Sequence, residues 1–312
     1  MYYHYTIIQW LFFFYFYCFV GWCIESSYVS LKERKWVNRG FMKGPFLPLY
    51  GSGSIIMLVV SQPFAEHWWA VYLAGCIGAT VLEYVTGVVM EVLFKVRYWN
   101  YFKQPYNFQG YICLGTSLAW GVLTLFMTYV IHQPIEHIVF LLREKYLTLI
   151  TILLTFYIVG DFTLSFRVAL DLRDILIRME KLKENLVHVQ KRLEVIMAVA
   201  GDAITESLGQ YKDVIVDKLK IEDVKENIEK MLDYVKESIH KKTAEYSDDT
   251  KKELFDLHTE YKVNAEKQEG FGKRNSLIRR IRNNPTMSSM KYKDALDELK
   301  RQADSKKNQK EK

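Results

Sequence analysis

Long apolar segments fill the first half of the chain, and they constrain its fold more than any other feature. Of the 312 residues, the first 166 carry only ten Lys or Arg and eight Asp or Glu, whereas residues 167–312 carry thirty-two and twenty-eight. Charged side chains are costly in lipid, so this division is typical of a membrane-embedded half followed by a soluble half. We therefore expect an all-α fold with about five membrane spans that continue into a cytoplasmic helical region.

Five segments come close to the roughly 20 apolar residues that a membrane helix needs. They are residues 5–24, 47–64, 68–94, 111–132 and 146–166. The second segment is the weakest of the five, because glycine and proline interrupt it. The first lacks a basic start and a cleavage site, so we interpret it as a retained span and not as a signal peptide.

Positive charge alternates between the connecting segments and predicts the orientation of the spans. Five Lys or Arg follow the first span and three follow the third, whereas the second connection has none and the fourth has two. Basic connections stay on the cytoplasmic side. The pattern predicts a multi-pass protein of the cell membrane with its N-terminus outside and its C-terminal region in the cytoplasm.

Acidic residues inside the spans are the best candidates for a functional site. In the third span, small and acidic residues recur every four positions, at Gly75, Ala79, Glu83, Gly87 and Glu91. This spacing places them on one helix face. We expect Glu83, with Glu25, Glu91 and Asp161, to form either a path for a solute, ion or proton or a set of polar contacts that fix helix packing.

Two glycine- and proline-rich loops resemble each other and indicate a weak internal repeat. The paired positions are Gly21 and Gly87, Glu25 and Glu91, Trp36 and Trp99, Asn38 and Asn100, Pro45 and Pro105, and Phe46 and Tyr106. If the repeat is real, a pseudo-twofold axis along the membrane normal relates the first two spans to the next two. Both loops would then face each other at the cytoplasmic mouth.

The sequence predicts that the polar half of the chain is helical. Apolar side chains recur with heptad spacing from Leu172 to Ala203, which predicts a coiled coil, either in a helical hairpin or in a homodimer. We expect residues 1–166 to form the transmembrane domain, 167–270 the coiled-coil region and 271–312 a basic tail with a short helix. Arg279, Arg280 and Arg282 in that tail could reach lipid headgroups or another acidic surface.

The sequence lacks the common catalytic signatures. No phosphate-binding loop, metalloprotease motif or nucleophile elbow is present, and no nucleic-acid module is evident. The four cysteines lie in or beside apolar runs, and we interpret them as buried thiols and not as metal ligands. We expect no metal and no cofactor, while a lipid-modifying enzyme that uses Arg39 stays open.

One loop and its later counterpart resemble a known family. The stretches "NRGFMKGPFLPLYGSG", "LEYVTG" and "YWNYFKQPYNFQGYICLG" resemble the Putative ABC-transporter type IV, or CmpB-like, family over roughly residues 10–135. The family pattern falls on Asn38, Arg39, Gly40, Phe41, Gly44, Pro45, Pro48, Tyr50 and Gly51. The counterpart loop adds the candidates Trp99, Asn100, Asn107 and Gly110. Where the family usually has Trp-Asp-Tyr, this chain has Asn100 in place of the acid.

The resemblance implies a bacterial permease-like membrane protein that works with a separate ATPase subunit. Our leading hypothesis is therefore a transport component that moves an unidentified small solute or ion, with the lipid bilayer and that subunit as partners. The alternative is a non-transporting membrane scaffold or sensor that acts through its cytoplasmic coiled coil. A homodimer formed through that coiled coil is compatible with either hypothesis.

Overall fold

The computed structural model of the chain describes residues 4–199, 225–233, 252–253, 255–263 and 275–308. The chain divides into two units. The first comprises Met1–Arg173 together with Arg279–Met290, and the second comprises Asp174–Ile278 together with Lys291–Lys312. The first unit thus contains all the apolar segments and a short polar segment from near the C-terminus. The division of the chain into three domains stays a prediction.

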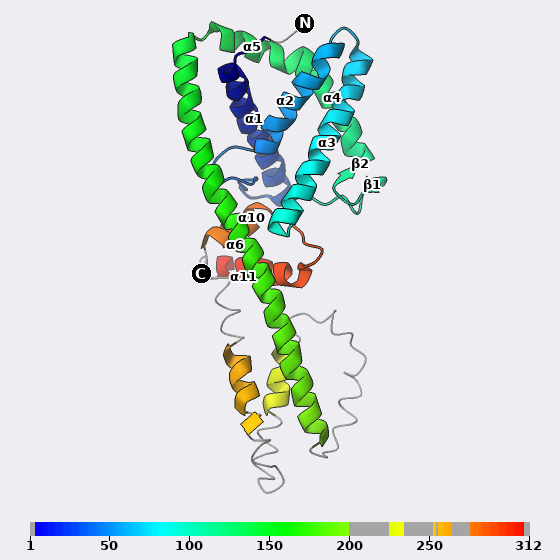
Figure 1. Cartoon of the computed structure of the whole chain (residues 1–312), viewed down its shortest axis with the longest axis vertical. Helices are drawn as coiled ribbons and strands as arrows, with labels where there is room; N and C mark the ends of the chain where they lie inside the picture. The colour runs from blue at the N-terminus through cyan, green and yellow to red at the C-terminus, as the bar shows by residue number, and fades with distance from the viewer. Residues whose placement is uncertain (1–3, 200–224, 234–251, 254, 264–274, 309–312) are drawn as a thin grey trace. The chain divides into compact units, whose positions relative to one another are not determined.

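Antiparallel helices build the first unit (Figure 1). Their bounds are α1 (Ile7–Glu33), α2 (Pro48–Ser61), α3 (Trp68–Phe94), α4 (Leu114–Phe126), α5 (His132–Leu141) and the beginning of α6 (Glu144–Val199). Neighbours in sequence pack against each other, so that α2 lies against both α1 and α3, and α3 lies against α4. The expected all-α fold is confirmed. The only strands among the described residues are β1 (Asn107–Phe108) and β2 (Ile112–Cys113), which form a short hairpin.

Local sequence signals set the ends of the first helix. Thr6 caps α1 by accepting a hydrogen bond from the Gln9 amide, and the Gln9 side chain accepts one from the Thr6 amide. This reciprocal pair satisfies two amides that the first turn leaves without helical partners. Arg34 ends the helix in the left-handed conformation. The predicted span at residues 5–24 therefore extends nine residues further, because nothing in the sequence breaks the helix before Glu33.

The number of spans is not settled by helix length. Four helical stretches are long and apolar enough to cross a membrane: Ile7–Glu33, Trp68–Phe94, Leu114–Leu141 and Glu144–Leu193. The predicted second span is helical from Pro48, but α2 has only 14 residues before the short 3₁₀ turn η1 (Gln62–Phe64). At 1.5 Å per residue, α2 is about 21 Å long, less than the ~30 Å of a hydrocarbon core. A fifth span stays a prediction.

The fourth span differs in detail from its prediction. Helix α4 passes through a π-helical turn, η2 (Met127–Ile131), into α5, and Figure 1 shows α5 running across the end of the unit. Such turns bend a helix because they insert an extra residue into the hydrogen-bond ladder. The change of direction at His132 coincides with the predicted end of this span. Helix α5 then leads directly to the start of α6.

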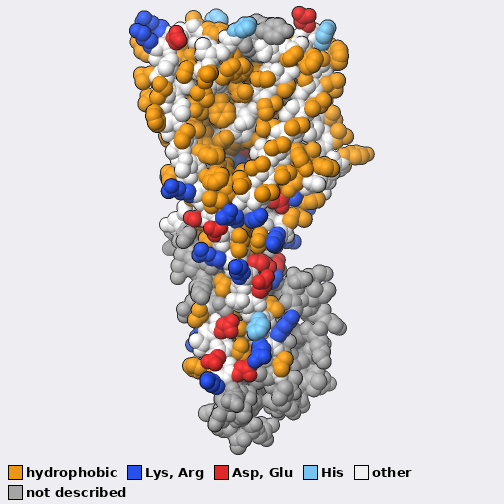
Figure 2. Space-filling view, in the orientation of Figure 1, with side chains coloured by type: hydrophobic (Ala, Val, Ile, Leu, Met, Phe, Trp, Pro, Cys, Tyr) orange, Lys and Arg blue, Asp and Glu red, His pale blue; other side chains and the backbone are white. Residues whose placement is uncertain are grey.

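Apolar side chains cover the outside of the first unit (Figure 2). On α3 they recur every three or four residues along one exposed face, at Leu73, Ile77, Val81, Val85, Val89 and Val92. The opposite face of α3 carries the small residues and Glu83, which are buried. This helix therefore turns its branched apolar side chains outward, as a lipid-facing helix does, and its small residues inward, where neighbouring helices pack closely.

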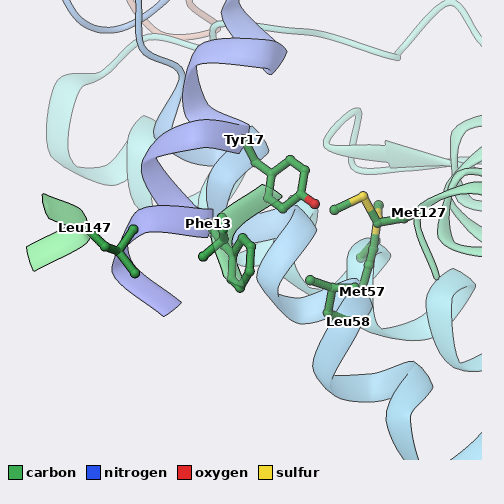
Figure 3. Close-up of a cluster of buried hydrophobic side chains, with 8 residues drawn as sticks. Phe13, Tyr17, Met57, Leu58, Met127 and Leu147 are labelled. Carbon is green, nitrogen blue, oxygen red and sulfur yellow. The ribbon is translucent and has the colours of Figure 1, made fainter. Parts of the chain in front are cut away.

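A buried cluster holds the helices together at the end of the unit opposite the two loops. Figure 3 shows Phe13 and Tyr17 of α1 near Met57 and Leu58 of α2 and Met127 of η2, with Leu147 of α6 in the same cluster. All six side chains are at most 4 % exposed. Because the cluster joins four elements, it fixes α1, α2 and α6 around one core.

The second unit contains the remainder of α6, helical residues 225–233 and 255–263, and α11 (Lys293–Asn308). Among the predicted heptad positions, those between Ile175 and Leu193 are buried. Lys183 forms an ion pair of 2.6 Å with Asp294 of α11, and Tyr261 donates a hydrogen bond to Glu229. Helix α11 therefore lies beside α6 in the second unit. The predicted positions Ala200 and Ala203 lie outside the described residues, and the coiled coil stays a prediction.

Candidate functional site

Glu83 occupies the centre of the buried face of α3. Its side chain is 5 % exposed, and it lies between Ala79 and Gly87, which place no bulk beside it. One carboxylate oxygen accepts a hydrogen bond of 3.0 Å from the Tyr101 hydroxyl, and the other accepts one of 2.9 Å from the Trp120 indole. Burial and the neighbouring Glu83 carboxylate raise the pKa of Tyr101, so its hydroxyl keeps its proton and remains a donor.

No Lys, Arg or His forms an ion pair with Glu83 among the residues that the structure describes. The hydrogen bonds from Tyr101 and Trp120 leave part of the acceptor capacity of the carboxylate unused, since each oxygen carries two lone pairs. A buried acid without a cationic partner is costly to maintain in a membrane protein. This feature separates Glu83 from Glu25 and Glu91, which each pair with an arginine.

Two cavities meet at Glu83. The larger has a volume of about 380 Å³ and extends from Glu83 toward the loops, where Glu25, Arg39 and Asn284 line it. The smaller has a volume of about 100 Å³ and extends along α1 toward Tyr17. Both are lined by Leu49, Tyr50, Glu83 and Trp120. The carboxylate therefore stands where an interior space near the loops narrows into the helix bundle.

Glu25 lines the larger cavity as part of a three-residue cluster. The Tyr50 hydroxyl donates a hydrogen bond of 2.9 Å to one carboxylate oxygen, and the Arg39 Nε lies 3.5 Å from the other. The first turn of α2 brings Tyr50 against α1, because Gly21 has no side chain at the contact: a Cβ there would lie 2.2 Å from the Tyr50 Cβ. Glu25 is therefore paired with a cation, unlike Glu83.

Glu91 lies in an equivalent cluster in the second half of the unit. The Tyr111 hydroxyl and the Arg97 Nε both donate hydrogen bonds of 2.5 Å to its Oε2 atom. Gly87 leaves room for the Tyr111 ring, as Gly21 does for Tyr50. The two clusters thus contain the same four residue types in the same sequence order, namely Gly21, Glu25, Arg39 and Tyr50 in the first and Gly87, Glu91, Arg97 and Tyr111 in the second. The paired arginines and tyrosines were not among the anchors that the sequence comparison used, because their spacings differ between the two loops.

Asp161 has the contacts of a loop anchor. Its Oδ2 atom accepts a hydrogen bond of 2.7 Å from the Gly44 amide, and it does not line either cavity described above. Gly44 lies so close to α6 that a Cβ would be 2.5 Å from the Tyr157 hydroxyl. Neither Asp161 nor Glu91 lies beside the cavities, so of the four predicted acids only Glu25 and Glu83 meet there. The assignment of all four to one path stays a prediction.

The residues of the family motif in the first loop shape the loop itself. Asn38 accepts a hydrogen bond from the Trp22 indole and donates one to the Lys43 carbonyl. Gly40 has a φ of 154°, which side chains rarely adopt. Phe46, after Pro45, donates its amide to the Gly44 carbonyl, and Pro48 is the first residue of α2. Further on, Gly51 packs against the buried Cys18.

The motif residues of the second loop do the same for the β-hairpin. The Trp99 indole donates to the Tyr111 carbonyl at 2.9 Å, and Asn100 accepts a hydrogen bond from the Phe102 amide. Asn107 accepts one from the Gly110 amide at the turn between β1 and β2. Gly110 has a φ of 72°. Of these four residues only Trp99 lines the larger cavity.

The comparisons with known proteins agree with this motif. The sequence profile of the family described as Putative ABC-transporter type IV matches residues 12–166. Residues 12–166 belong to that family. No curated protein matches the chain, and no solved structure matches it. With its long apolar helices, the chain is a membrane protein associated with transport.

The family region holds most of the candidate site. Glu25, Arg39, Tyr50, Glu83 and Trp120 all lie within residues 12–166, so the Putative ABC-transporter type IV segment contains both cavities' acids and their donors. The match extends beyond the region 10–135 that the motifs indicated, and includes the first part of α6. Its limit at residue 166 leaves out one contributor to the cavity.

That contributor is the segment Arg279–Met290, which sequence reasoning did not connect with the site. Arg39 donates hydrogen bonds of 2.9 Å to Asn284 and to Thr286, and one of 3.0 Å to the Tyr98 carbonyl. Ser288 forms an antiparallel bridge with Arg97. The segment therefore contacts both arginines of the repeated clusters. In the sequence this stretch stood out only by its basic residues, which gave no sign of these contacts.

Arg280 anchors this segment beneath the helices. Its guanidinium donates two hydrogen bonds to the Tyr98 hydroxyl and one of 2.7 Å to the Ser165 carbonyl, and it lies 4.4 Å from the Phe41 ring centroid. Burial raises the pKa of Tyr98, whereas Arg280 lowers it. Because Arg280 is only 7 % exposed, it is not available to lipid headgroups. That expectation was therefore wrong for Arg280.

A second polar cluster lies at the opposite end of the unit. His132 is 1 % exposed, and its two ring nitrogens lie 2.9 Å from the Tyr5 hydroxyl and 2.8 Å from the Tyr17 hydroxyl. Tyr5 also donates a hydrogen bond of 2.5 Å to Glu136. Local sequence patterns do not reveal this cluster, because the partners of His132 lie more than 100 positions away in the chain.

Proposed function

We propose that this chain is the membrane-embedded component of a transporter, and that the solute passes through the first unit beside Glu83. The observation that carries the proposal is the position of Glu83 where the two cavities meet, buried and without a cationic partner among the described residues. Membership of residues 12–166 in a family of transporter type supports the same function.

In this proposal the chain spans the cell membrane several times, with the loops after α1 and α3 on the cytoplasmic side. The seven Lys and Arg of these loops support that orientation. Energy would come from a separate ATPase subunit, since the chain has no phosphate-binding loop of its own. Such a subunit would meet the loops and not the opposite end.

Purification from native membranes tests this function. The tagged chain is extracted in mild detergent, the proteins recovered with it are identified by mass spectrometry, and the complex is reconstituted into liposomes. We expect an ATPase subunit and ATP-dependent uptake of at least one component of a cell extract. Recovery of the chain without an ATPase, and liposomes that take up nothing, would contradict the proposal.

The variant Glu83→Gln tests the role of the acid in the same assay. Removal of its charge should abolish uptake while insertion and complex formation persist, because glutamine keeps the side-chain shape and an acceptor for Tyr101 or Trp120. Glu33→Gln is the matched control, since Glu33 carries the same charge near the same loops but is exposed and makes only a 4.0 Å contact with Lys35. Full uptake by Glu83→Gln would remove this residue from the path.

A non-transporting scaffold or sensor is the second candidate. It is supported by the length of α6, whose 56 residues correspond to a helix on the order of 80 Å long, well beyond what a span needs. Deletion of residues 172–260 discriminates between the two functions. A transporter should keep ATP-dependent uptake after the deletion, whereas a scaffold should lose its biological effect although the remaining helices still insert.

A further inference from the structure

The larger cavity has an unusual lining for a path that would serve a hydrated inorganic ion. Nine of its 22 lining residues are aromatic, and six of the others have apolar side chains, namely Leu47, Pro48, Leu49, Val89, Met90 and Leu93. Alkali and alkaline-earth ions need several oxygen ligands around them. No group of three or more potential metal ligands occurs in the described part of the chain. The cavity therefore suits a ligand with an apolar body.

The charges around the cavity favour a cation. Three charged side chains line it, namely Glu25, Arg39 and Glu83. Arg39 lies beside Glu25, and its remaining nitrogens donate to Asn284, Thr286 and the Tyr98 carbonyl, so this guanidinium offers little to an anionic ligand. Glu83 has no such counter-charge among the described residues, so its carboxylate can be neutralised by a cationic ligand.

The aromatic rings next to Glu83 suit the same ligand. Tyr101 and Trp120 both donate hydrogen bonds to the carboxylate, so the two rings stand directly beside it, and Tyr50 and Trp99 line the same space. The faces of such rings attract ammonium groups, most strongly when water is excluded. A carboxylate flanked by tryptophan and tyrosine recognises an organic ammonium group by charge and by ring faces together.

We propose that the larger cavity binds an organic monocation, an amine or quaternary ammonium with an apolar substituent, whose positive group rests against Glu83. The volume of about 380 Å³ lies within the range of small-molecule pockets. This inference rests on the proposed transport function, to which it adds the class of substrate. The chemistry requires no covalent step.

Isothermal titration calorimetry of the purified full chain in detergent micelles tests the site. Benzyltrimethylammonium is the probe, and benzenesulfonate, an anion of similar size, is its control. We expect the cation to bind and the anion not to bind. Glu83→Gln should weaken cation binding by about tenfold or more, because it removes the charge at short range in a poorly solvated site. Glu33→Gln should bind as the unmodified chain does.

A second variant keeps the test valid if Glu83→Gln does not fold. Thr86→Phe leaves the carboxylate in place but fills part of the cavity that Thr86 lines, and should also weaken cation binding. Equal binding of both probes, or undiminished cation binding in Glu83→Gln or Thr86→Phe, would overturn the inference. Cation binding without ATP-dependent uptake would contradict the transport function alone. Uptake of other solutes without cation binding would overturn this inference alone.

Discussion

At the scale of single residues, three acids with similar sequence surroundings have different environments. Glu25 and Glu91 each pair with an arginine and a tyrosine, whereas Glu83 accepts hydrogen bonds from neutral donors only, among the described residues. A paired acid fixes a loop against a helix, and an unpaired acid is available to a ligand. The difference arises because Arg39 and Arg97 lie on the loops and not among the helices. Their side chains therefore reach Glu25 and Glu91 but do not pair with Glu83.

This difference predicts that substitution by glutamine destabilises the protein at Glu91 but does not destabilise it at Glu83. Glu91→Gln should destabilise the protein by about 3 kcal/mol, because it leaves the Arg97 guanidinium buried without its counter-charge. The side chain of Arg97 is only 9 % exposed. Thermal unfolding in detergent measures the effect. The prediction would be contradicted by a Glu91→Gln variant that unfolds at the same temperature as the unmodified chain. A Glu83→Gln variant that unfolds at a lower temperature would contradict it as well.

At the scale of elements, the polar segment Arg279–Met290 completes the end of the unit where the two loops lie. It begins within α10 (Asn275–Asn283) and reaches Arg39, Arg97 and Tyr98, three residues of the loops. Its backbone bridge to Arg97 and its side-chain bonds to Arg39 join the two loops. The loops are therefore held partly by a segment that lies about 180 residues beyond the second of them.

Substitution of Arg280 should release this segment. Arg280→Ala removes three hydrogen bonds and the contact with Phe41, so amide hydrogen exchange in residues 279–290 should increase by about tenfold or more. Arg279→Ala is the matched control, because Arg279 is the exposed neighbour on the same helix. If both variants exchange alike, Arg280 is not the anchor.

At the scale of the whole molecule, the distribution of charge predicts the sides of the membrane. The connection 62–67 contains no Lys or Arg, whereas the loops 34–47 and 95–113 together contain seven. Antiparallel helices place these loops at one end and the connection 62–67 at the other (Figure 1). We expect the basic end to face the cytoplasm.

Single cysteines test this orientation, once Cys18, Cys23, Cys76 and Cys113 are replaced. A membrane-impermeant maleimide should label Glu66→Cys in intact cells and Lys35→Cys only after the cells are permeabilised. The opposite labelling would reverse the proposed orientation. Labelling of both positions in intact cells would exclude a cytoplasmic location for the first loop.

The sequence by itself determined the helices of the first unit and the buried face of α3. Apolar length, the Thr6 cap and the four-residue spacing of small residues are local signals, and α3 begins and ends at the predicted residues Trp68 and Phe94. Local signals also identified Glu83 as the leading acid. They could not show which acids have cationic partners, because those partners approach through loops of unequal length.

Only the tertiary structure decided how the parts of the site meet. Arg39 and Asn284 are 245 positions apart, and Tyr17 and His132 are 115 apart. Periodicity within a helix shows which residues a few positions apart share a face, and it gives no information on contacts between residues so far apart in the chain. The cavities are likewise spaces left between helices after they pack. Their positions depend on all the surrounding side chains together, and not on any one segment.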